Sequence, residues 1–215
     1  MGRGHLVVEG HGEVRAALNL VIRLWQDLQL PPLHWADPIR GRQLHTREGL
    51  ARVSNLARYR DAGTLLVLRD EDDACPMETA PQGAHWLLEA DLPFPAALVL
   101  LHREYETIFL PCAAQMAGRP LVDERGVQRP GLVQGASFAG DPEGVRGAKE
   151  WLSARFPPGR SYKPSLDQLP MTRMLDFEVL RQAKLPSFLH LERALSFLAN
   201  PPTGTRVYPP PEAER

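Results

Sequence analysis

Acidic residues gather at the ends of three apolar runs in this sequence. Glu9 and Glu13 follow H-L-V-V, Asp70 and Asp72 follow T-L-L-V-L-R, and Glu104 follows A-A-L-V-L-L-H-R. Carboxylates that crowd together repel one another and raise one another's pKa values. A divalent cation relieves this repulsion, and Mg²⁺ (or Mn²⁺) takes oxygen ligands of this kind. The pattern therefore indicates a metal site able to assist phosphoryl transfer or phosphodiester hydrolysis.

Acids after strands also have a simpler explanation. They often cap helices or form turns, and a single D-x-D pattern arises easily by chance. Among the remaining acids, we interpret Glu71 and Asp73 as solvent-facing or capping residues. Glu106 is the weakest candidate, because Glu104 is nearer to the end of its strand.

The first half of the chain has the elements needed to bring these acids together. Apolar runs predict strands at 5–9, 64–69 and 96–102, and helical spacing predicts helices at 14–28, 46–62 and 76–90. The segment 104–116 is expected to be helical despite Pro111. The strands are continuous apolar runs, which is typical of a parallel sheet covered on both faces. We expect a three-layer α/β domain, in which functional residues lie just beyond the carboxyl ends of the strands.

The second half differs in composition. Residues 118–141 are rich in Gly and Pro and predict a loop or hairpin, and helices are expected at 142–155, 176–184 and 187–199, the last with Ser187 as its N-cap. The expected organisation is a metal-binding core at 1–117, a helical appendage packed on it at 118–200, and a Pro-rich tail at 201–215, disordered or lying on the surface.

Composition narrows the class of protein. The 215 residues suit one domain, and the net charge of −1 gives no overall attraction to nucleic acid or membrane. Cys75 and Cys112 form neither a metal-binding pair nor a disulfide framework, which favours a reducing cytoplasm. No stretch approaches the ~20 apolar residues that span a bilayer, so we expect no membrane association.

The strongest local charge lies between residues 40 and 60. It consists of Arg40, Arg42, Arg47, Arg52 and Arg58, together with Arg60 and His45, against Glu48 alone. Such a cluster can neutralise the phosphates of DNA or RNA. It can equally be a solvated helix face or a docking surface for an acidic partner.

The motifs V-V-E-G-H-G-E at 7–13 and L-V-L-R-D-E-D-D-A at 66–74 resemble the Toprim (topoisomerase–primase) fold, which has a Glu-Gly after its first strand and a D-x-D after a later one. Glu13 resembles the additional acid of the overcoming-lysogenization-defect nucleases. Small stand-alone Toprim-like bacterial proteins have similar runs to three in this chain: H-R-E-Y-E-T-I-F-L at 102–110, S-Y-K-P-S-L-D at 161–167 and P-S-F at 186–188. This resemblance covers most of 5–199, and its Toprim part about the first 110 residues. Glu71 departs from the family, because the middle position of its D-x-D is usually small.

The resemblance implies a role for each candidate residue. Asp70 and Asp72 would hold Mg²⁺, Glu9 would be a further ligand or the general acid/base, and Glu13 and Glu104 would complete a second metal site or orient water. Lys163 or Lys149 would stabilise the transition state, unless both are solvated surface lysines. The family also implies a separately encoded ABC-type or AAA-type ATPase partner and a role in antiphage defence.

Three functions remain open at this stage. The first is a Mg²⁺-dependent nuclease, as monomer or homodimer, that cuts DNA or RNA. The second is a non-catalytic Toprim scaffold that binds a partner protein or nucleic acid. The third is another phosphoryl-transfer enzyme, such as a nucleotidyltransferase or phosphatase. The chain has no G-x-x-x-x-G-K-[ST] motif and therefore is not itself a P-loop ATPase.

Overall fold

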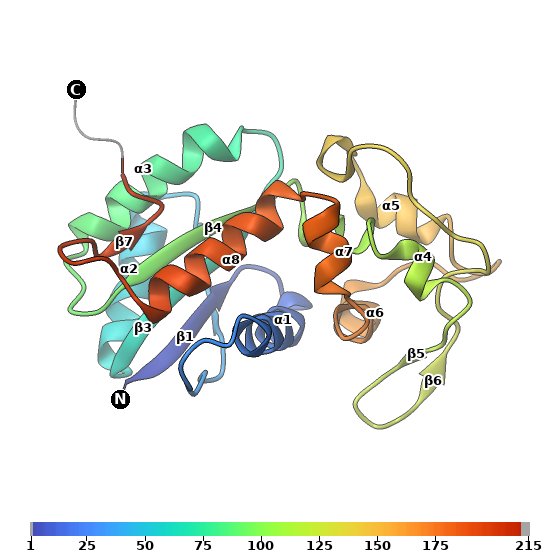
Figure 1. Cartoon of the computed structure of the whole chain (residues 1–215), viewed down its shortest axis with the longest axis horizontal. Helices are drawn as coiled ribbons and strands as arrows, with labels where there is room; N and C mark the ends of the chain where they lie inside the picture. The colour runs from blue at the N-terminus through green and yellow to red at the C-terminus, as the bar shows by residue number, and fades with distance from the viewer. Residues whose placement is uncertain (1, 212–215) are drawn as a thin grey trace.

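A five-stranded parallel sheet lies among helices in the left half of Figure 1. The structure is a computed structural model that describes residues 2–211. Across the sheet, the strands are β2 (Ile39–Arg40), β1 (Arg3–Val8), β3 (Ala62–Glu71), β4 (Ala96–His102) and β7 (Val207–Tyr208). Every neighbouring pair is parallel. All five carboxyl ends therefore point to the same edge of the sheet.

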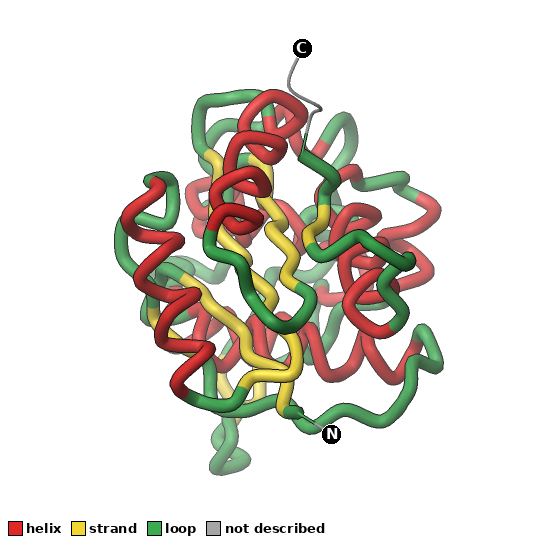
Figure 2. The backbone as a smooth tube through the Cα atoms, turned by 90° about the vertical axis from the view of Figure 1, so that its left-hand side faces the viewer, coloured by secondary structure: helices red, strands yellow, loops and turns green. Residues whose placement is uncertain are grey.

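Both faces of the sheet are buried, as the continuous apolar runs predicted. Alternate residues of a strand point to opposite faces, so Leu66 and Leu68 join one core, whereas Leu65 and Val67 join the other. Helices α2 (Arg47–Tyr59) and α3 (Pro76–Glu89) cover the second core, and α1 (Glu13–Asp27) and α8 (Pro186–Ala199) cover the first. Figure 2 shows the strands side by side with helices on both sides. The expected three-layer α/β fold is confirmed.

Local sequence explains where the layer helices begin. The Thr46 hydroxyl accepts a hydrogen bond of 3.1 Å from the Gly49 N–H at the start of α2. Proline occupies the first turn of α3 and of α8, where its missing N–H removes no helical hydrogen bond. The expected N-cap at Ser187 is wrong, because α8 already begins at Pro186 and Leu185 is its N-cap.

Residues 103–185 form a long excursion between β4 and α8, at the right of Figure 1. Its elements are η1 (Tyr105–Phe109), α4 (Ala113–Met116), β5 (Leu121–Val122), β6 (Gln128–Arg129), η2 (Pro142–Gly144), α5 (Ala148–Ser153), α6 (Pro164–Thr172) and α7 (Phe177–Gln182). Its buried apolar side chains belong to the same core as α1 and α8. The excursion is therefore packed on the sheet domain through a continuous core.

Several local expectations need correction. The helix expected at 104–116 is a 3₁₀-helix followed by the short α4, because Pro111 between them has no N–H to continue helical hydrogen bonding. The hairpin expected within 118–141 is present as the antiparallel pair β5–β6. The tail is not wholly disordered or superficial, since β7 adds the fifth strand and Val207 is buried. Residues 212–215 of that tail lie outside the described residues.

Candidate functional site

The parallel sheet brings the acidic strand ends together. Val7 of β1 is in register with Val67 of β3, and Asp70 of β3 is in register with Leu101 of β4. Glu9 follows β1 and Glu104 follows β4, so both lie at the edge where β3 presents Asp70. This edge is where the ligand sites of open parallel sheets usually lie.

Asp70 is the centre of the acidic cluster. One of its carboxylate oxygens, Oδ1, is buried and has no hydrogen-bond partner within residues 2–211. Burial raises the pKa of Asp70 well above its usual value, and the negative charges of Glu13 and Glu106 raise it further. The positive charge of Lys149 opposes these effects without cancelling them. A buried and unsatisfied carboxylate of this kind calls for a cation or a proton.

Glu13 stands beside Asp70 at the start of α1. Its Oε2 accepts a hydrogen bond of 3.1 Å from the Gly10 N–H, which closes the turn between β1 and α1. A Cβ at position 10 would meet the end of the Glu13 side chain, so a larger residue there would displace the Glu13 carboxylate. Burial raises the pKa of Glu13 despite this hydrogen bond, and the charge of Glu9 contributes to the increase.

Glu9 is directed toward the neighbouring loop. Its Oε1 accepts a hydrogen bond of 3.0 Å from the Leu44 N–H. The bond ties the end of β1 to the loop that follows β2. One oxygen of Glu9 is thus already engaged, and the residue belongs to the rim of the cluster.

Lys149 links the two acids that follow β4. Its ammonium lies 2.7 Å from a carboxylate oxygen of Glu104 and 3.3 Å from one of Glu106. Its backbone N–H also donates to Glu104, over 3.1 Å. Burial alone would lower the pKa of Lys149, but the charges of Glu106, Glu104 and Asp70 raise it above its usual value. Lys149 therefore remains protonated and supplies a fixed positive charge at the site.

Glu106 is almost fully buried, at 1% exposed. Its Oε1 accepts hydrogen bonds from the Tyr162 hydroxyl at 2.8 Å and from the Gln168 amide at 3.3 Å. Burial raises the pKa of Glu106, whereas Lys149 and the Tyr162 hydroxyl lower it. Sequence reasoning ranked Glu106 last, yet the structure places it among the residues whose charge acts on Asp70. A charged residue inside the apolar run Y-E-T-I-F-L was the available signal.

The excursion supplies the walls of the site. Tyr162 and Gln168 lie just before and within α6, and α5 carries Lys149. A side chain added at Gly12 would come within 2.7 Å of Gln168 and 3.0 Å of Pro164, so α6 packs closely against the β1–α1 turn. Asp167 holds this segment together by accepting hydrogen bonds from the Arg160 guanidinium at 2.5 Å and the Lys163 N–H at 2.9 Å. The S-Y-K-P-S-L-D run therefore positions a helix beside the acids.

The three acids that follow Asp70 at the end of β3 do not join the buried part of the cluster. Asp72 is exposed, and its charge acts on Asp70 only weakly, as the last of the causes that raise the Asp70 pKa. Glu71 is mostly buried and lies 2.7 Å from the Arg69 guanidinium; its other oxygen accepts from the Ala74 N–H at 3.4 Å. Asp73 is exposed and pairs with Arg146 at 2.7 Å, which lowers its pKa. The structure thus separates Asp72 from the buried part of the cluster.

Of the two lysine candidates, Lys149 contacts the acids directly. Lys163 is exposed, and its side chain forms no hydrogen bond or ion pair within residues 2–211. Only its backbone N–H has a defined role, at the start of α6. The structure thus distinguishes two lysines that the sequence could not.

The arginines of the basic cluster fall into two groups. Arg47 forms a bidentate pair with Glu89, with both contacts at 2.9 Å, and Arg58 donates to the Ala90 and Asp91 carbonyls. Arg40, Arg42 and Arg52 are exposed and form no ion pair with another residue of the described chain. Because β2 is parallel to β1, Arg40 and Arg42 lie at the same sheet edge as Glu9. These two are the arginines best placed for a ligand at the acidic cluster.

The donor chemistry of the cluster fits a hard divalent cation only in part. Within residues 2–211, no three Asp, Glu, His or Cys side chains converge closely enough to form a ready metal cage. Mg²⁺, however, is usually held by one or two carboxylates with water and substrate phosphate as its other ligands. The unpartnered oxygen of Asp70, with Glu13 beside it, fits that mode of binding. A cage built from all five predicted acids does not fit.

Comparison with known proteins adds no family assignment. No family model matches the chain, and no curated protein matches it. Within residues 2–211, no helix has the length and apolar character needed to cross a membrane.

Proposed function

We propose that this protein is a divalent-cation-dependent phosphodiesterase of the Toprim type that cleaves DNA or RNA. The observation that carries this proposal is the buried carboxylate of Asp70, which has no hydrogen-bond partner for Oδ1 and a strongly raised pKa, at the carboxyl edge of a parallel sheet. Placing an uncompensated carboxylate there destabilises the protein, and such costs are common at functional sites.

Asp70 and Glu13 are the residues that would hold Mg²⁺ or Mn²⁺. When bound, the cation would act as a Lewis acid on a phosphodiester and promote attack by water. Lys149 would keep Glu104 and Glu106 in place and offer positive charge to a phosphoryl oxygen. Burial raises the pKa of Glu106, so this carboxyl would be a candidate to carry a proton in the reaction. Glu9 would orient the loop that bears Arg42.

The nucleic-acid assignment depends on the arginines beside the acids. A carboxylate cluster repels a polyanion unless cations compensate for it. Arg40 and Arg42, at the same edge, would contact backbone phosphates near the scissile bond. The resemblance to small Toprim-like proteins adds an ATPase partner and a role in antiphage defence to the proposal, and the cysteine usage adds a cytoplasmic location.

One observation favours the alternative, a non-catalytic scaffold that binds a partner protein or nucleic acid. The Lys149 ammonium already pairs with Glu104 and Glu106, and the Leu44 N–H already binds Glu9, so two of the five predicted acids, Glu104 and Glu9, have partners without any metal. On this view the cluster is structural, and the exposed arginines serve only for docking.

Calorimetric titration with Mn²⁺ and Mg²⁺ tests the proposal, with wild type, Asp70→Asn and Asp73→Asn compared. Asp73 is the matched control, because it is exposed and pairs only with Arg146. We expect wild type and Asp73→Asn to bind metal and to cleave fluorescent single- and double-stranded DNA or RNA, and Asp70→Asn to lose both activities. Metal binding without cleavage would favour the scaffold, and equal binding by all three proteins would rule out Asp70 as a ligand.

A stability measurement distinguishes a functional role of Asp70 from simple unfolding of the variant. Folding raises the pKa of Asp70, so the folded protein holds this proton more tightly and loses stability as pH rises through that pKa. In a chelating buffer at pH 8, Asp70→Asn should therefore melt at a higher temperature than wild type. The difference should shrink as pH falls, and saturating metal should stabilise wild type but not Asp70→Asn.

A further inference from the structure

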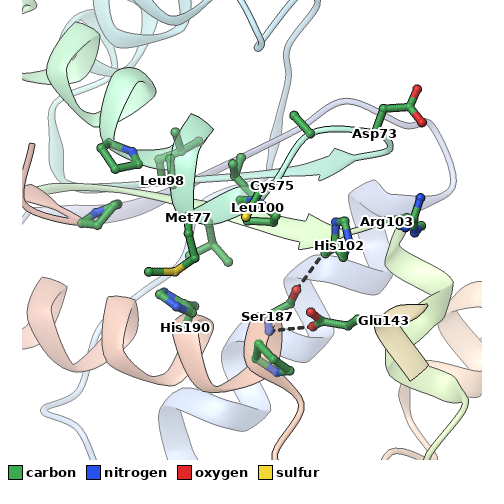
Figure 3. Close-up of a pocket in the computed structure, with 17 residues that line it drawn as sticks. Asp73, Cys75, Met77, Leu98, Leu100, His102, Arg103, Glu143, Ser187 and His190 are labelled. Carbon is green, nitrogen blue, oxygen red and sulfur yellow. Dashed lines mark hydrogen bonds between the residues drawn. The ribbon is translucent and has the colours of Figure 1, made fainter. Parts of the chain in front are cut away.

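A groove of about 450 Å³ lies over β4 between α3 and α8, apart from the acidic cluster (Figure 3). Met77 and Ala80 of α3 form one wall, and Ser187 and His190 of α8 form the other. Leu98 and Leu100 of β4 form the floor. The wall from α3 is apolar, and Met77 is 68% exposed although it faces the groove. A flexible, exposed methionine is typical of surfaces that adapt to a ligand.

The floor of the groove is an open strand edge. β7 pairs with β4 only at Ala96 and Ala97. The Ala96 N–H donates to the Arg206 carbonyl at 2.9 Å, and the His102 N–H donates to the Ser187 hydroxyl at 2.9 Å. Alternate residues of a strand direct their backbone groups to the same edge, so Leu100 also faces this side. No strand within residues 2–211 pairs with β4 beyond Ala97 there.

The sequence explains why the protein's own chain leaves this edge open. Tyr208, the last residue of β7, is followed by Pro209, Pro210 and Pro211. Proline has no N–H and cannot continue a ladder of hydrogen bonds. β4, by contrast, continues to His102. The edge strand is therefore blocked from extending, and the backbone groups of β4 from the Leu98 carbonyl to Leu100 are left without a strand partner between α3 and α8.

We propose that this groove binds an extended peptide segment of a partner protein, which adds a strand to β4 in continuation of β7. The pairing of β7 demonstrates that this edge accepts a strand. Main-chain hydrogen bonds to the Leu98 carbonyl and to Leu100 would provide affinity, and side chains that alternate between the two walls would provide specificity. The apolar α3 wall predicts an apolar residue facing Met77, and the α8 wall a polar residue facing His190. Four residues span about 13 Å, the length of the open edge. The proposal does not depend on the metal site.

Selection from a phage-displayed library of random heptapeptides tests this proposal. Panning is done in parallel on wild type, Met77→Glu and Leu88→Glu. Both variants place a carboxylate at an exposed position of α3, but Leu88 does not line the groove. We expect wild type and Leu88→Glu to enrich the same proline-free peptides with alternating apolar residues, and Met77→Glu to bind these peptides at least tenfold more weakly. No enrichment, or equal binding to Met77→Glu, would overturn the proposal.

Cys75 provides a native reporter for the same site. It is exposed and lines the groove, whereas Cys112 is buried and burial raises the pKa of its thiol to about 11. The best selected peptide, made synthetically, should slow iodoacetamide alkylation of Cys75 saturably, and a version with alternate backbone amides methylated should not. Equal protection by the methylated peptide would exclude strand pairing. Protection that rises with protein concentration alone would assign the groove to a second copy of the chain and overturn the proposal.

Discussion

At the scale of single residues, the charges around Glu106 determine how stable the buried carboxylates of the acidic cluster are. Glu106 is buried, and Lys149 is the cation that contacts it. Lys149 also contacts Glu104 and lowers the pKa of Asp70, so one ammonium stabilises three carboxylates. Removing one partner of a buried pair costs more than the pair itself contributes, because the other charge remains buried.

Lys149→Met tests this role. Because Lys149 is partly exposed, we expect the free energy of unfolding at pH 7 to fall by about 1–3 kcal/mol, which is less than for a fully buried pair. The loss should be smaller at pH 5. Without Lys149 the pKa of Glu106 rises further, the folded state binds that proton more tightly, and the folded protein is destabilised only as pH rises through that pKa. Urea denaturation at both pH values measures the difference.

Lys184→Met is the control, because Lys184 is also exposed but forms no ion pair with the described chain. A loss for Lys149→Met that is the same at pH 5 and pH 7 would mean that packing, and not charge, is what Lys149 contributes.

At the scale of secondary-structure elements, the sheet edge is built from distant parts of the chain. β4 is flanked by β3 on one side and by β7 on the other, and the excursion and α8 intervene between β4 and β7. Val207 of β7 packs in the same core as α2 and α3. β7 thus contributes a buried side chain to the core that α2 and α3 cover.

Val207→Ala tests whether β7 contributes to the fold. Val207 is 3% exposed, so removing two methyl groups should lower the free energy of unfolding by about 1–2 kcal/mol. Thr203→Ala, at an exposed position of the same segment, should have almost no effect. Thermal and urea denaturation measure both variants. An unchanged stability for Val207→Ala would indicate that β7 is detached in solution.

The spacing of apolar residues predicted the helices and strands that bury one whole side in the core. It did not predict elements that are very short or that contain proline. β1, β3, β4, α1 and α3 were expected close to their observed positions, because each has a long apolar run or stripe. β2 has two residues and offers no period to detect. α6 contains Pro170 in its interior and so resembles a loop in sequence.

For the candidate site, the sequence predicted only the part that depends on where the strands end. Glu13 and Asp70 lie together as expected, because parallel strands bring their carboxyl ends to one edge. The roles of Glu106 and Lys149 depend on the packing of α5 and α6, which no local pattern reveals. The exposure of Asp72 was likewise invisible, since D-x-D spacing does not show which acid turns inward.

At the scale of the whole molecule, a nearly neutral protein carries separated local charges. The acidic cluster and the exposed Arg40 and Arg42 lie at one edge of the sheet, whereas Arg47 and Arg58 are bonded to the end of α3 and the turn that follows it. A phosphate backbone would therefore meet the first pair and not the second. The composition alone could not predict this division.

The two groups of arginines allow a matched test of nucleic-acid binding. The double variant Arg40→Ala/Arg42→Ala should reduce the slope of log affinity against log salt by about 2 and weaken binding most at low salt. Arg47→Ala should leave the slope nearly unchanged and cost at most about 1 kcal/mol of stability, because its partner is the surface residue Glu89. Fluorescence anisotropy with labelled DNA and RNA measures the slopes. Equal effects per arginine removed would mean that the arginines act only through net charge.

The pairing of Ala96 with Val207 also has a consequence for synthesis of the chain on the ribosome. When β4 has emerged, the residues of α8 and β7 that cover its face and edge have not yet been translated. The nascent protein must therefore expose the apolar strand Ala96–His102 while the whole excursion is made. We expect this interval to be the step most prone to aggregation and most dependent on chaperones, because an uncovered apolar strand edge readily pairs with other chains.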